Sequence, residues 1–253
     1  GASDLAREFG IESTDAVKSL YQAISAGVPA AEAVEFLRQA AIGAKGGVAD
    51  LTQSVDIGTN MLNAYGMESK NLGTVMDSVF VAVKLGKTTF GELSEAIGRV
   101  APIAASAGVQ VDELNGAIAA LTIQGINTNE AVTGVRSALT NILKPTSDAT
   151  KMAEELGIEF SAAALKSKGL QQFLAEIMDT INEKGLDSSD VLTQLFGDIN
   201  GVNAVLALTA NEGKQFATVM EAMAEKGGSA STAFETIKKN DPTLAFAQMT
   251  QAV

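Results

Sequence analysis

The feature that most constrains this chain is a helical apolar period that glycine interrupts again and again. Leu72, Met76, Val79 and Val83 recur at spacings of four and three residues, and several other segments repeat this spacing or a close relative of it. Such spacing places apolar side chains on one face of an α-helix. Strand-type alternation never persists for the length of a strand. The sequence therefore predicts an all-α fold.

Start and stop signals divide this pattern into short helices. Thr89 with Glu92, Asn127 with Glu130, and Asp50 with Gln53 have the spacing of N-terminal capping pairs. A Gly or Pro ends nearly every run within about 20 residues, which favours many short helices over a continuous coiled coil. We expect them to pack into one or two globular units. The predicted helices are residues 14–26, 29–42, 50–65, 70–85, 89–107, 112–124, 128–143, 146–156, 169–184, 188–196, 201–210, 213–225 and 230–250.

The least periodic interior stretch, residues 161–169, is the predicted boundary between two parts of the chain. On this interpretation residues 1–160 form a helical core domain and residues 161–253 a C-terminal helical subdomain. The alternative is a surface loop inside one domain. The residues expected in the core are Leu72, Met76, Phe80, Val83, Leu114, Ile118, Leu121, Val135, Leu139, Leu174, Ile177 and Ile181.

Composition excludes several kinds of chemistry. The 253 residues include no His, Cys or Trp, so neither a Ser-His-Asp nor a Cys-His nucleophilic site can be built, nor a zinc site of the usual Cys/His type. With 30 acidic and 18 basic residues the net charge is -12, which argues against direct nucleic-acid binding. No basic segment leads into an apolar one as in a secretory signal. We expect no enzyme activity, no catalytic residue, no cofactor and no metal.

Three candidate motifs have structural interpretations that outweigh the chemical ones. Residues 43–47 (GAKGG) lack the spacing of a phosphate-binding loop, and we expect a flexible joint. Residues 197–201 (GDING) lack the ligand pattern of an EF-hand, and we expect a tight turn between helices. Carboxylate pairs close in sequence are expected to be solvated surface. These pairs are Glu32/Glu35, Glu92/Glu95, Glu154/Glu155 and Asp187/Asp190.

A proline inside the predicted helix 89–107 marks a candidate hinge. Pro102 removes one backbone hydrogen bond and crowds the carbonyl of Gly98, four residues earlier. We expect a kink or break here, with Gly98 and Pro102 as the hinge residues if the break is functional. Residues 100–129 carry only two charges, Asp112 and Glu113. They predict a helical hairpin that fills the core, or one that enters a bilayer after a conformational change.

An ordered series of short segments resembles the core region of phage tail tape measure proteins, over roughly residues 15–210. The segments are LNAYG at 62–66, RVAPIA at 99–104, AGV at 107–109, EL at 113–114, IAAL at 118–121, GI at 125–126, AVTGVR at 131–136, LKP at 143–145, LGI at 156–158 and LFG at 195–197. The resemblance implies a structural virion protein that occupies the tail tube lumen, helps set tail length and leaves ahead of the DNA. It transfers no catalytic residue.

The same resemblance implies partners and locations. Partners would be tail tube proteins, tail tip or baseplate proteins, tail assembly chaperones and other copies of the chain in the tube. The protein would lie in the virion or, during assembly, in the bacterial cytoplasm, and at the host envelope and membrane after ejection. A ruler needs an uninterrupted helix that gains about 1.5 Å per residue, so this chain would be a compact part with the ruler outside it. A membrane-perturbing or pore-forming helical protein and an enzyme with a carboxylate-only site are the alternatives.

Overall fold

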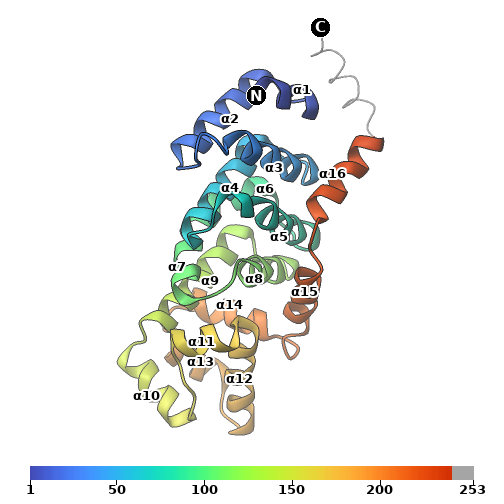
Figure 1. Cartoon of the computed structure of the whole chain (residues 1–253). Helices are drawn as coiled ribbons and strands as arrows, with labels where there is room; N and C mark the ends of the chain where they lie inside the picture. The colour runs from blue at the N-terminus through green and yellow to red at the C-terminus, as the bar shows by residue number, and fades with distance from the viewer. Residues whose placement is uncertain (241–253) are drawn as a thin grey trace. The chain divides into compact units, whose positions relative to one another are not determined.

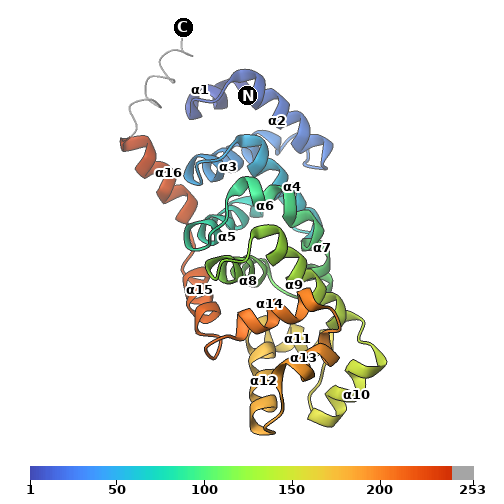
Figure 2. The same cartoon turned by 180° about the vertical axis from the view of Figure 1, so that it is seen from behind.

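The computed structural model describes residues 1–240 and shows sixteen α-helices, two short 3₁₀-helices and no strand in that range (Figure 1). The all-α prediction is confirmed. The longest helix within these residues, α9 (Thr128–Leu143), has 16 residues. The expected helix 230–250 begins as α16 (Ser229–Asn240), and its predicted residues beyond 240 lie outside the described range. Figure 2 shows the helices from behind.

The chain forms two compact units, and each is assembled from separate stretches of sequence. Within the described residues, unit 1 contains residues 1–84, 89–98 and 226–240, and unit 2 contains residues 85–88 and 99–225. Residue 160 lies inside unit 2, where the Phe160 ring packs against those of Phe173 and Phe196 at centroid distances of 6.0 and 5.3 Å. A separate domain of residues 1–160 stays a prediction.

Unit 1 contains α16 and the first six helices of the chain. These are α1 (Ala2–Phe9), α2 (Ser13–Ser25), α3 (Ala33–Gly46), α4 (Leu51–Tyr65), α5 (Leu72–Leu85) and α6 (Phe90–Ala96), with a 3₁₀-helix at Ser69–Asn71. The sequence pattern missed α1 and placed the start of α3 four residues too early. The capping predictions hold here. Thr89 Oγ1 accepts a hydrogen bond from the Glu92 N–H at 3.2 Å, and Gln53 Oε1 accepts from the Asp50 N–H at 3.2 Å.

Unit 2 contains the remaining nine helices of the described range. They are α7 (Ala101–Ala107), α8 (Val111–Ile123), α9, α10 (Ser147–Leu156), α11 (Ala162–Lys168), α12 (Leu170–Glu183), α13 (Ser188–Phe196), α14 (Ile199–Thr209) and α15 (Lys214–Ala224). The stretch 161–169 is not the surface loop that was the alternative expectation, because residues 162–168 form α11; its role as a boundary stays a prediction. The cap of α11 is local, because Ser161 Oγ accepts from the Ala164 N–H at 3.1 Å. Seven residues are too few to show a helical period.

The predicted core is buried except at two positions. Phe80 and Val83 are half-buried, while Leu72, Val75, Met76 and Val79 line the buried face of α5. At about 100° per residue, Phe80 lies roughly 80° around the helix from Leu72 and so leaves that face. Val83 lies in the last turn of α5. Every other predicted core residue is buried.

Candidate functional site

The predicted hinge is a real interruption of the helix. The expected helix 89–107 is replaced by α6, a 3₁₀-helix at Ile97–Arg99, and α7. The prediction that Pro102 lies in the interior of a continuous helix is wrong. Pro102 occupies the first turn of α7, behind the N-cap Val100, where its missing N–H needs no partner within the helix. The break is therefore confirmed, and its cause is a new helix start at Ala101.

Gly98 lies on the unit 1 side of this interruption. An added Cβ would sit 3.5 Å from the Asn60 side chain, an ordinary contact distance, so packing does not require glycine here. The next residue, Arg99, belongs to unit 2 and donates a hydrogen bond to Asn129 Oδ1. A hinge function for Gly98 and Pro102 stays a prediction.

The hairpin of α7 and α8 lies in the core of unit 2. Every residue of α8 from Leu114 to Thr122 is buried, and α8 packs against α9 and α15. Glu113, one of the two charged residues of the hairpin, accepts two backbone hydrogen bonds. Its Oε1 accepts from the Leu170 N–H at 2.6 Å, and its Oε2 accepts from the Gln110 N–H at 2.9 Å. Among residues 1–240, no helix combines the length and apolar character needed to cross a membrane.

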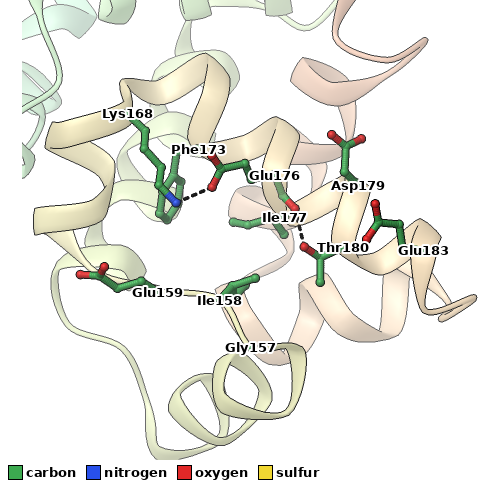
Figure 3. Close-up of a pocket in the computed structure, with 10 residues that line it drawn as sticks. All are labelled: Gly157, Ile158, Glu159, Lys168, Phe173, Glu176, Ile177, Asp179, Thr180 and Glu183. Atoms are coloured by element: carbon green, nitrogen blue, oxygen red, sulfur yellow. Dashed lines mark hydrogen bonds and ion pairs between the residues drawn. The ribbon is translucent and has the colours of Figure 1, made fainter.

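An acidic pocket of about 420 Å³ opens on unit 2 beside α12 (Figure 3). Phe173 and Ile177 are its buried apolar lining, and four carboxylates border it: Glu159, Glu176, Asp179 and Glu183. Figure 3 shows Lys168 reaching toward Glu176, with which it forms an ion pair.

The Glu176 carboxyl does not have the raised pKa that a general acid needs. The hydrogen bond from Lys168 is the main cause that lowers the pKa of the Glu176 carboxyl below its ordinary value. A general acid needs a raised pKa so that it holds a proton near neutral pH. In the part of the chain that the structure describes, no group of three or more acidic side chains has an arrangement that could hold a metal ion. The arrangement offers a surface notch of negative charge.

The three candidate motifs take structural roles. Residues 43–46 are not a flexible joint, because they form the last turn of α3. The glycines of this motif permit close packing. A Cβ on Gly43 would lie 2.6 Å from the Met76 sulfur, and one on Gly47 would lie 2.1 Å from the Phe90 ring. The predicted turn is confined to Gly197 and Asp198, and residues 199–201 begin α14, where Asp198 Oδ1 accepts from the Asn200 N–H at 2.7 Å. All four carboxylate pairs are exposed, as predicted.

Comparison with known proteins gives one consistent family. The model of the phage-related minor tail protein family matches residues 2–197. A tape measure protein of Pneumococcus phage Dp-1 is 26% identical over 240 residues, which cover 94% of this chain and 21% of the phage protein. A probable tape measure protein of Clostridium phage phiCD119 is also 26% identical over 240 residues, covering 91% of this chain and 25% of that protein.

The match to a third relative covers less of this chain. A probable tape measure protein of Escherichia phage P2 is 25% identical over 158 residues, which cover 61% of this chain and 19% of that protein. The chain thus spans between a fifth and a quarter of the length of the first two relatives. No solved structure matches it.

Proposed function

Because the chain belongs to the phage-related minor tail protein family, we propose that it is the compact, globular part of a tape measure protein of a phage tail. In this role it lies in the tail tube lumen of the virion, takes part in setting tail length and assembly, and leaves the tube during genome ejection. Its partners are tail tube proteins, tail tip or baseplate proteins, assembly chaperones and other copies of the chain.

The observation that carries this proposal is the combination of the family match with short helices. A straight helix of about 240 residues would measure roughly 360 Å, whereas α9, the longest described helix, spans about 24 Å. Sixteen short helices packed into two units cannot act as an extended ruler. The length-determining helix therefore belongs to other parts of the tape measure protein.

The structure also favours one of the alternatives for residues 100–129. The apolar surface of α8 is buried against α9 and α15 in the core of unit 2. This supports the core role over membrane perturbation. The exposure of the carboxylate pairs and the lowered pKa of Glu176 support a structural protein over a carboxylate-only enzyme.

The test is an in-frame deletion of residues 1–240 in the phage that encodes the chain, with tail lengths measured by electron microscopy. A compact part predicts a shortening well below the roughly 360 Å of a straight helix. The matched control removes the same number of residues from a segment of the protein predicted as one continuous helix, and should shorten the tail by about 360 Å. A full-length shortening in the first variant, or absence of the chain from purified virions by mass spectrometry, would contradict the proposal.

A further inference from the structure

Helix α16 completes unit 1 from the far end of the chain. The rest of the described part of unit 1 comes from residues 1–84 and 89–98, whereas α16 follows after the whole of unit 2. The chain passes from unit 2 to unit 1 between Glu225 and Lys226. Figures 1 and 2 both show α16 lying alongside α3, its main partner in unit 1.

Three contacts hold α16 against unit 1. The Asp77 carboxylate accepts hydrogen bonds from the Gly228 and Ala230 N–H groups, at 2.8 and 2.9 Å, and so caps the start of the helix. Gly46 lets α16 approach closely, because a Cβ there would lie 2.7 Å from the Ala230 carbonyl oxygen. Further along, the rings of Phe9 and Phe234 are both buried and their centroids are 5.0 Å apart.

We call Phe9, Gly46 and Asp77 the α16 seat. They come from α1, α3 and α5, and all lie within residues 1–84 of unit 1. The seat is thus made by a part of the chain that contains neither α16 nor the residues that lead into it. A second copy of the chain presents the same seat with the same three contacts.

The segment that leads into α16 is built to change direction. Gly228 has φ +74°, a left-handed conformation, and an added Cβ at Gly227 or Gly228 would meet nothing within 4 Å. The left-handed conformation accounts for glycine at 228, but neither packing nor backbone conformation requires it at 227. Glycine changes between left-handed and extended conformations at almost no steric cost. The pair therefore allows α16 to leave its own unit 1 without strain elsewhere.

From these contacts we infer that α16 exchanges between two copies of the chain, each copy inserting its helix into the α16 seat of the other. Exchange re-forms every contact of the closed chain, so the two arrangements differ mainly in hinge conformation and in the entropy of association. The exchange does not depend on the proposed function.

Two full-length variants test this inference, one with a blocked seat and one with a disabled helix. Gly46→Val blocks the seat and leaves α16 intact. The double variant Ala230→Asp, Phe234→Asp leaves the seat intact and disables α16. Each variant alone should be a monomer in light scattering. An equimolar mixture should form a one-to-one complex of twice the mass, because the intact helix of the first variant enters the intact seat of the second.

Two controls separate helix exchange from other association. Adding Asp77→Ala to the variant with the intact seat should weaken the complex at least tenfold, because the cap of α16 is lost. Adding Gly46→Val to the variant with the disabled helix leaves it with neither an intact seat nor an intact α16, and this chain should not bind the Gly46→Val variant. Circular dichroism establishes that every variant is folded.

A hinge variant keeps the inference falsifiable if a seat variant fails to fold. Deleting Lys226 and Gly227 keeps the Gly228 donor to Asp77 and shortens the reach of α16 by about 7 Å, so the helix should dock only in another copy and the chain should become dimeric. Adding Gly46→Val to this deletion should restore the monomer. A hinge-deleted chain that stays monomeric, or a folded mixture that forms no complex, would overturn the inference.

Discussion

The carboxylate of Glu113 ties together two helices that are far apart in the chain. It accepts one backbone hydrogen bond at the start of α8 and another from Leu170 at the start of α12. Hydrogen bonds to charged groups contribute roughly 1.5–3 kcal/mol each, and a backbone donor left without its acceptor loses that contribution. Glu113→Ala should therefore lower the free energy of unfolding by about 2–4 kcal/mol in denaturant titrations.

The control for this variant is Glu154→Ala, which removes an exposed carboxylate on α10. It should change the free energy of unfolding by less than about 0.5 kcal/mol. Equal effects of the two substitutions would show that the bond between Glu113 and Leu170 contributes nothing specific.

Burial raises the pKa of the Asp56 carboxyl on α4 above its ordinary value of 3.8. The folded state then binds this proton more tightly than the unfolded state, so stability falls as pH rises from the ordinary pKa through the raised one. Asp56→Asn removes the charge and should raise the Tm at neutral pH, with a gain that shrinks as pH is lowered toward 3.8. Exposed Asp179→Asn is the control. A gain that does not change with pH would contradict this account.

Single residues differ in how far the sequence predicts them. The burial of Leu114, Ile118 and Leu121 followed from spacing, because helical periodicity depends only on neighbours along the chain. The packing role of Gly43 and Gly46 did not, because their contacts, Met76 and Ala230, are distant in sequence. The acidic pocket was missed for another reason: Lys168 and Glu176 are only eight residues apart, but the break between α11 and α12 brings them together, and α11 was not predicted.

The break between α6 and α7 arises because a new helix begins at Ala101, and this changes the expected effect of substituting the two hinge residues on stability. Gly98→Ala should raise the free energy of unfolding by about 0.4–1 kcal/mol, because the alanine restricts the unfolded chain and fits beside Asn60. Pro102→Ala should lower it by a similar amount, because Pro102 suits the first turn of α7. Thermal melts of the single variants distinguish these opposite signs.

The matched control at this scale is Gly108→Ala, at the end of α7. Gly108 has φ +80°, and a Cβ there would lie 2.8 Å from the Lys166 side chain, so this substitution should destabilise the protein. If Gly98→Ala also destabilised it, the contact with Asn60 would be tighter than the structure indicates.

Elements were predictable where a helix is long enough to repeat its pattern. The break at Pro102 and the caps at Thr89 and Asn127 were read correctly, because capping is a local interaction. Helices α1 and α11 were missed because they have only eight and seven residues. They are stabilised by packing within their units rather than by a period of their own.

The division of the whole molecule predicts which fragment folds. Residues 85–225 contain all of unit 2 and should give a helical protein with one cooperative thermal transition by circular dichroism. In the fragment 1–160, residues 99–160 should stay unfolded, because they lack Phe173 and Phe196, which pack on Phe160 in unit 2. A fragment 1–160 in which residues 99–160 are helical and unfold cooperatively would instead support the boundary expected from the sequence.

The two-ended construction of unit 1 has a consequence for synthesis on the ribosome. At about 5–20 residues per second, the roughly 130 residues between Gly98 and α16 take on the order of 6–26 s to translate. Throughout that time the N-terminal part of unit 1 lacks α16, and the Phe9 ring is not yet covered by the ring of Phe234. Unit 2 is therefore the first to be complete, although it is not the first to emerge. A nascent chain on the same messenger meets this uncovered surface before the chain's own α16 exists.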